Sequence, residues 1–377
     1  MEILRLLRAR RDGLIRRVPR QVLLGLCVAV MAGPLAPGLA QQARGAGTST
    51  NVRWQVKNRE HVDLWLHGFA MITDDSAPVP LFRRGYREAL TVEKNKAGVF
   101  TDLDANHDAL ARRLRANPAL VSAQFLPLSF GSWAELERAV DVFLKAEGSA
   151  RAARTQQEAA LISGLTATFP AREDSEFARR FLNSLWNERD RFYHAWWLAE
   201  TRRRDPVLEV VDTLWQNSWR PRFQPFLDHT QQGNGELVLA LALEGEGRTI
   251  GGGKQHNTIT VGFPDSAARA LDAIYAFAHE AVGPLTGAAV EDNTTPAEKR
   301  SGAADRLASL ALVRGGALLL AHVSKDLAEG YARFYLRAAG AAPRGDDALA
   351  ALARVFPVPQ GILDSVERQI AIAFGGI

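Results

Sequence analysis

Hydrophobic and polar positions alternate with a period of two in one segment of the second half of the chain. Within residues 257–263, three apolar side chains fall on one face and Thr258 and Thr260 on the other, which predicts a strand. Asp265 or Ser266 is expected to cap a helix that follows this strand. We expect the strand to form the exposed edge of a small sheet, where Thr258 and Thr260 would meet an extended peptide.

Most of the remaining chain has apolar residues three and four positions apart, which is the spacing of amphipathic helices. Residues 236–243 are apolar enough for a buried strand, and residues 51–72 fit either two strands or a strand followed by a helix. The predicted fold class is therefore α+β, mostly α-helical, with a small sheet. Helical segments are expected at 103–120, 133–144 (capped by Ser132), 173–200, 207–219, 307–323, 325–338, 346–356 and 360–374.

Composition divides the chain into four parts. An arginine-rich start, an apolar run and small residues up to Ala40 are typical of a secretory signal peptide, and that apolar run is short for a membrane span. The apolar segment 307–323 is interrupted by Arg314 and two glycines and is expected to be a core helix, so no membrane span is predicted after signal removal. The predicted parts are a signal peptide at 1–40, a flexible leader at 41–51, a mainly helical N-terminal region at 52–235 and a C-terminal core at 236–377, in a protein exported to the periplasm or the extracellular medium.

The charge of the chain changes once the signal peptide is set aside. The full sequence has 46 basic and 42 acidic residues and a formal net charge of +4. The predicted signal holds seven arginines and two acids, so its removal leaves 39 basic and 40 acidic residues and a formal charge of −1. A near-neutral chain lacks the electrostatic basis for nucleic-acid binding, so no nucleic-acid partner is expected. The single cysteine, Cys27, is lost with the signal, which excludes disulfides and thiol chemistry in the mature chain.

Aromatic and polar clusters elsewhere have structural interpretations. Phenylalanines and tryptophans at helical spacing across residues 173–219 favour a helix–helix core, and a platform for a sugar or an aromatic ligand is the alternative. His61 and His67 are six positions apart, which suits neither one helical face nor one strand face strictly, so both are expected at the surface. The run from Arg202 to Arg204 is expected at a solvated helix end.

The predicted helix after the strand carries the dipeptide His279-Glu280. In the H-E-x-x-H pattern of zinc peptidases, two histidines four positions apart share one helical face and bind zinc, and the glutamate acts as general base. In this chain, the position four residues after His279 is Gly283. The sequence therefore has the strand–helix order of such a site without its second histidine.

Residues 279–293, HEAVGPLTGAAVEDN, resemble the motif H-E-x-x-H-P-x-x-N-P-x-x-E-x-N of a group of secreted bacterial zinc peptidases of the gluzincin, thermolysin-like type. A weaker similarity lies at residues 59–64, REHVDL. The resemblance implies a metallopeptidase-like C-terminal core in which the edge strand packs on the active-site helix. It also implies that His279 is a zinc ligand, that Glu280 is the general base, and that the third ligand is a glutamate on the following helix.

Two of the three expected ligands are missing, because Gly283 replaces the second histidine and residues 309–314 contain no carboxylate. The first hypothesis is therefore a degenerate relative without bound zinc that acts as a binding or structural module, with an extended peptide or a protein as partner. The alternative is an active zinc-dependent peptidase in which non-standard ligands complete His279 and Glu280. The candidates for this alternative are His256, Glu291, His322, Asp326 and Glu329 as ligands and Tyr331 or Tyr335 as oxyanion donors.

Overall fold

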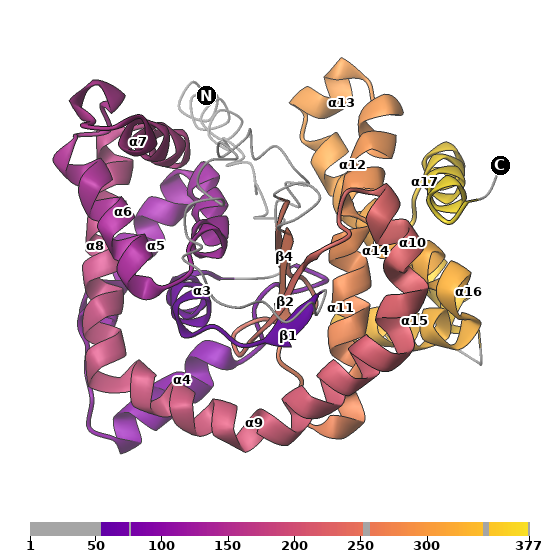
Figure 1. The fold of residues 1–377 in the computed structure, drawn as a ribbon, viewed down its shortest axis with the longest axis horizontal. Helices are drawn as coiled ribbons and strands as arrows, with labels where there is room; N and C mark the ends of the chain where they lie inside the picture. The colour runs from indigo at the N-terminus through magenta and orange to yellow at the C-terminus, as the bar shows by residue number, and fades with distance from the viewer. Residues whose placement is uncertain (1–53, 75–76, 252–256, 342–346, 376–377) are drawn as a thin grey trace, which may run out of the picture.

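The structure, a computed structural model, describes residues 54–74, 77–251, 257–341 and 347–375, and it is mostly helical around a small sheet (Figure 1). The predicted α+β, mostly α-helical class is confirmed. The predicted signal peptide and leader lie outside the described residues. The α-helices are α3 (Glu60–Ile72), α4 (Tyr86–Lys96), α5 (Asp102–Ala116), α6 (Trp133–Lys145), α7 (Gln156–Thr168), α8 (Arg172–Glu188), α9 (His194–Leu214), α10 (Arg220–His229), α11 (Leu271–Ala281), α12 (Gly283–Asp292), α13 (Pro296–Arg300), α14 (Ala303–Val323), α15 (Lys325–Ala338), α16 (Ala348–Val355) and α17 (Gln360–Ala373).

The sheet has the strand order β1-β2-β4-β3. Strands β1, β2 and β4 run parallel, and β3 runs antiparallel to β4. Leu237 of β2 lies opposite Val56 of β1 and Ile259 of β4, so apolar side chains continue from strand to strand. Because β1 pairs with β2, the sheet takes strands from both the predicted N-terminal region and the predicted C-terminal core. The strands are β1 (Gln55–Lys57), β2 (Gly235–Ala240), β3 (Arg248–Gly251) and β4 (Asn257–Gly262).

The predicted edge position of β4 is wrong, because β4 is an inner strand. β2 pairs with one side of it and β3 with the other, where Thr249 lies opposite Ile259. Thr260 is fully buried and Thr258 is 7% exposed, so neither side chain is placed to meet an extended peptide. The alternation of apolar and polar residues identified the strand, but it carries no information on which strands flank it.

A long helical run frames the sheet. Figure 1 shows α8, α9 and α10 following one another around three sides of the sheet, which lies between α3 and α11. Two π-helical turns, η3 (Arg189–Tyr193) and η4 (Trp215–Trp219), join the three helices, and such turns are a common cause of bends. On the inner side of α8, Phe177 stacks on Phe181 with ring centroids 5.6 Å apart. These rings are buried, as expected of a helix–helix core.

Helix α14 lies at the centre of the C-terminal helices and packs against α11, α12, α15 and α17. Within the described residues it is the one helix long and apolar enough, by length and composition alone, to cross a membrane. Its packing depends on Gly316, because a Cβ atom there would lie 2.2 Å from the hydroxyl oxygen of Tyr331 on α15. The glycine pair that interrupts this apolar segment in the sequence thus faces two neighbours, because a Cβ atom at Gly315 would lie 2.4 Å from Cγ2 of Thr286 on α12.

Several polar residues lie elsewhere than predicted. His61 and His67 are buried rather than at the surface, because α3 is enclosed by other elements along almost its whole length. Arg204 is also buried, and its guanidinium donates to the carbonyl oxygen of Phe263 over 2.8 Å. Asp265 pairs with Arg204 over 2.9 Å and does not cap α11, and no side-chain cap bond is formed by Ser266 either.

Candidate functional site

The C-terminal end of α11 places His279 and Glu280 against the sheet. Alanine, isoleucine and phenylalanine side chains bury most of this helix between β4 and α14, so its last turn is held firmly. His279 is 1% exposed and the Glu280 side chain is 11% exposed. The order of strand and helix predicted from the sequence thus holds, although the strand that Glu280 contacts is β3.

The Glu280 carboxylate joins α11 to the segment that contains β3. Its Oε1 accepts a hydrogen bond from the backbone N–H of Gly247 over 2.9 Å, and its Oε2 accepts one from the Thr249 hydroxyl over 2.8 Å. The approach requires a glycine at 247, because a Cβ atom there would lie 2.7 Å from Cγ of Glu280 and 2.4 Å from the carbonyl oxygen of Thr260. Burial opposes ionisation of Glu280, but the hydrogen bonds from His279 and Thr249 outweigh it and lower the pKa of this carboxyl.

His279 lies between this carboxylate and α15. Its Nδ1 is 3.1 Å from Oε1 of Glu280, and its ring stacks on Tyr335 with centroids 5.2 Å apart. Tyr335 in turn donates its hydroxyl to the carbonyl oxygen of Gly245 over 2.8 Å. Tyr331 donates to the carbonyl oxygen of Val313 over 2.9 Å, and burial raises its pKa well above the usual value. Both hydroxyls are therefore engaged by backbone carbonyls.

The other predicted metal ligands are not brought to His279. The ring of His322 stacks on Phe374, which directly follows α17, and Glu329 pairs with Arg333 over 3.0 Å. Glu291 pairs with Lys299 over 3.2 Å. In the part of the chain that the structure describes, no group of three or more His, Cys, Asp or Glu side chains could hold a metal ion.

Two further predicted ligands complete this comparison. Asp326 lies exposed in the first turn of α15, and His256 lies outside the described residues. Among the described residues, none completes a group of three ligands with His279 and Glu280. His322 and Glu329 have other partners, Phe374 just after α17 and Arg333 on α15, and the ligand roles predicted for them stay predictions.

A second buried polar cluster was missed by the sequence analysis. His67 of α3 has its Nε2 3.2 Å from Oε1 of Glu188 and its Nδ1 3.1 Å from the hydroxyl of Tyr86. Lys94 donates to both oxygens of Glu188, over 2.8 and 3.1 Å, and the Thr101 hydroxyl also donates to this carboxylate. Burial opposes ionisation of Glu188, yet the hydrogen bond and charge of His67 and the charge of Lys94 lower its pKa to about 2. These residues come from separate elements, so no spacing in the sequence could indicate that they lie together.

Helix α3 carries two more buried groups with displaced pKa values. Asp63 accepts hydrogen bonds from the backbone N–H of Leu241 over 2.7 Å and from the Trp197 indole over 3.0 Å. Burial nevertheless raises the pKa of Asp63 to about 7. Burial also lowers the pKa of His61 to about 4, although its bond with the Phe130 carbonyl opposes the change. Both groups connect α3 to its neighbours.

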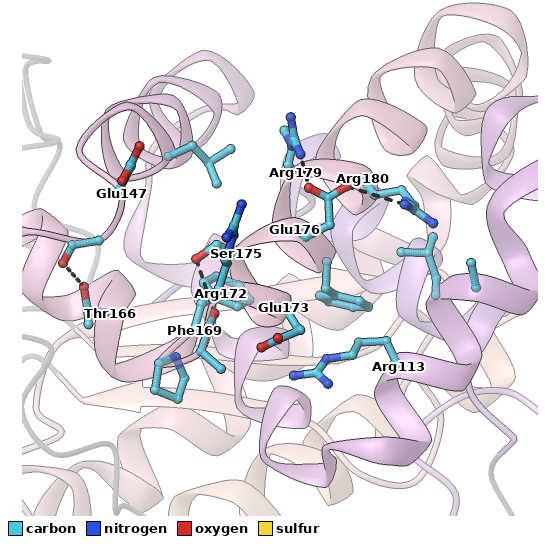
Figure 2. A pocket seen from close by; sticks show the side chains of 17 residues that line it. Arg113, Glu147, Thr166, Phe169, Arg172, Glu173, Ser175, Glu176, Arg179 and Arg180 are labelled. Carbon is cyan, nitrogen blue, oxygen red and sulfur yellow. Dashed lines mark hydrogen bonds and ion pairs between the residues drawn. The ribbon is translucent and has the colours of Figure 1, made fainter.

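Two cavities open at a distance from His279 and Glu280, which line neither of them. The first, of about 1180 Å³, lies between α5, the turn after α6, the end of α7 and the start of α8 (Figure 2). The second, of about 360 Å³, lies between α5 and α8. Both are open to solvent; polar and charged side chains line the second, and polar, charged and apolar side chains together line the first.

Comparisons of the chain with protein-family models, with curated proteins and with solved structures found no match. The class of this protein is therefore described by its fold and by the geometry of the site. It is a mostly helical α+β protein in which a buried histidine–glutamate pair joins one helix to the antiparallel edge strand of a small sheet.

Proposed function

We propose that this protein acts by binding rather than by hydrolysis, on a scaffold that resembles a secreted zinc peptidase. The observation that carries the proposal is the position of the Glu280 carboxylate, since each of its oxygens accepts a hydrogen bond from β3 or the residue just before it. A general base has to reach the proton that it removes, usually from a metal-bound water in this chemistry. Glu280 instead joins α11 to β3, and His279 joins the same helix to α15.

Binding is proposed at the cavities along α5 and α8. The inner position of β4 removes the surface on which a peptide would have added a strand. The cavities are independent of the His279 pair, so the proposed binding does not require zinc. Export to the periplasm or the medium, proposed from the arginine-rich and apolar start of the sequence, would give this surface access to extracellular ligands.

Metal content and peptidase activity test the proposal. We expect the purified chain, dialysed against a zinc buffer, to retain no stoichiometric zinc and to leave a fluorescent casein substrate uncleaved. We expect His279→Ala to lower the free energy of unfolding by about 1–3 kcal/mol, with or without zinc, because Glu280 loses a buried partner. The exposed His107 of α5 offers a matched control, and His107→Ala should leave stability unchanged.

A restored motif sharpens the same test. Gly283 is buried at the start of α12, where a Cβ atom has only Leu312 within 4 Å, at 3.9 Å. We expect Gly283→His to bind no stoichiometric zinc, because the described residues supply no third ligand. Stoichiometric zinc in the unmodified chain that disappears in His279→Ala, together with casein cleavage, would overturn the proposal in favour of the zinc-dependent peptidase.

A further inference from the structure

The two cavities belong to one groove along the α5–α8 helix pair. They share three lining residues, Glu176, Arg179 and Arg180, so the cavities meet over the middle of α8. Figure 2 shows Arg179 and Arg180 on the two sides of Glu176, and both guanidinium groups pair with its carboxylate. These pairs are on the surface, where a competing polar ligand can replace them at little cost.

The floor of the groove is rigid. Helices α5 and α8 pack antiparallel: Arg113 bonds the buried Asp174 over 2.5 Å at one end, and Asn106 bonds Ser184 over 3.1 Å towards the other. Asp102 at the start of α5 donates its backbone N–H to Asn187 over 2.9 Å. From Asp102 to Arg113 the groove is roughly 16 Å long at the rise of an α-helix, which suits an extended chain of several units.

The charges of the groove favour a neutral ligand. Its lining contains four arginines and four acidic side chains in total, so no net field attracts a polyanion or a polycation. Planar polar groups line the groove, among them the amide of Asn183 and the guanidinium of Arg172, whereas those of Asn106 and Arg113 are already bonded to Ser184 and Asp174. Such groups donate and accept hydrogen bonds in one plane, as a ring bearing several hydroxyl groups requires.

Two exposed aromatic residues, which line neither cavity, are close in sequence to the residues at the Asp102 end of the groove: Phe100 precedes Asp102 by two positions, and Trp186 precedes Asn187, which bonds Asp102. Trp186 is 53% exposed and Phe100 is 66% exposed, the highest values among the large apolar side chains of the described residues. Trp186 follows Asn183 by three positions on α8, so the two side chains are neighbours on the helix surface. The carbonyl of Phe100 accepts a hydrogen bond from Arg191 over 2.9 Å, which fixes this segment beside the end of α8.

We propose that this groove binds a neutral oligosaccharide, with one sugar ring against Trp186 and the following rings along α8. The C–H face of a pyranose ring packs on an aromatic face, while its hydroxyl groups bond to the amide and guanidinium groups of the groove. The oligosaccharide proposal rests on the proposed function, because a bound sugar has a biological role only if the protein acts by binding. The groove itself requires neither His279 nor Glu280.

Calorimetric titration with two probes, chitohexaose and cellohexaose, tests the ligand class. We expect at least one of them to bind the purified chain, and Trp186→Ala and Asn183→Ala each to weaken that binding at least tenfold. Ile372 of α17 is an exposed apolar residue away from the groove, and Ile372→Ala should change the affinity less than twofold. Circular dichroism of each variant checks that the fold is retained.

Two results would overturn the oligosaccharide proposal. One is the absence of binding of both hexaoses at millimolar concentration, and the other is binding that Trp186→Ala and Asn183→Ala leave unchanged. An uncharged hexapeptide that binds in place of the hexaoses and responds to both substitutions would also overturn it and assign the groove to a peptide. Zinc content is measured separately, so a zinc peptidase that binds hexaose would contradict only the proposed function.

Discussion

Two buried histidine–glutamate pairs lie in different halves of this molecule. His67 and Glu188 are 3.2 Å apart in the helical half and fully buried. His279 and Glu280 are 3.1 Å apart beside the sheet, with side-chain exposures of 1% and 11%. The first pair could not be predicted from the sequence because its members are 121 positions apart, whereas the second could be examined as a motif because its members are adjacent.

The two carboxylates are stabilised by different partners. Glu188 has the ammonium group of Lys94 at 2.8 Å, a charge that has to be buried with it. Glu280 has a backbone N–H and a threonine hydroxyl, which are neutral donors from β3 and the residue just before it. A buried charge left without its counterion costs more than a lost neutral donor. We therefore expect the His67–Glu188 pair, which belongs to no sequence motif, to contribute more to the free energy of unfolding than the His279–Glu280 pair, which resembles part of a catalytic site.

The largest expected effect is that of removing the counterion. Lys94→Met keeps the length of the side chain but leaves Glu188 buried with no ammonium group, so we expect the free energy of unfolding to fall by about 3–5 kcal/mol. Urea unfolding followed by circular dichroism measures the change. Lys96→Met on the same helix is the control, because Lys96 is 66% exposed and its ion pair within the described residues is with Glu93. Equal midpoints for the two variants would contradict the importance of the Lys94–Glu188 pair.

A smaller effect is expected from Asp63 and His61, which pull the pH dependence of stability in opposite directions. The pKa of Asp63 is about 7 in the folded chain against an ordinary 3.8, so its stabilisation is complete below pH 4 and is lost as the pH rises to 7. The pKa of His61 is about 4 against an ordinary 6.5, so its contribution is complete above pH 6.5 and is lost as the pH falls to 4. Between pH 4 and pH 7, the two changes in the free energy of unfolding nearly cancel.

Single substitutions should reveal each slope. In Asp63→Asn we expect the free energy of unfolding to rise by about 3 kcal/mol more than in the unmodified chain between pH 4 and pH 7, because His61 acts alone. In His61→Gln we expect it to fall by a similar amount relative to the unmodified chain. Urea midpoints at four pH values measure both slopes. Identical slopes in the unmodified chain and both variants would show that neither group is displaced in this way.

Local pattern predicted much of the fold. Ser132 caps α6 as expected, with its hydroxyl accepting from the N–H of Glu135, and α15 occupies the predicted residues 325–338. Of the segment 51–72, the described residues 54–72 form the predicted strand-then-helix alternative. These features depend on side chains a few positions apart, which a sequence displays directly.

Relations between distant segments could not be predicted. The period-two pattern of β4 does not show that β3 occupies the edge, and nothing near Thr258 indicates it. The same holds for Arg204, whose neighbours Arg202 and Arg203 are exposed while it is buried against Phe263. For the candidate site, the predicted order of strand and helix around His279 and Glu280 holds, but the donors that engage Glu280 are Gly247 and Thr249, which lie 33 and 31 positions away in the sequence.

The smallest expected effect is that of removing the Tyr335 hydroxyl, which distinguishes a structural role of this hydroxyl from a chemical one. Tyr335→Phe removes the hydroxyl that bonds the Gly245 carbonyl but keeps the ring that stacks on His279. We expect the free energy of unfolding to fall by about 0.5–1.5 kcal/mol, the range of one buried hydrogen bond, with no change in oligosaccharide binding at the groove. Urea unfolding and calorimetry measure the two quantities. A loss of 3 kcal/mol or more would mean that this hydroxyl also anchors the segment before β3, and the His279–Glu280 pair would then depend on α15 as strongly as Glu188 depends on Lys94.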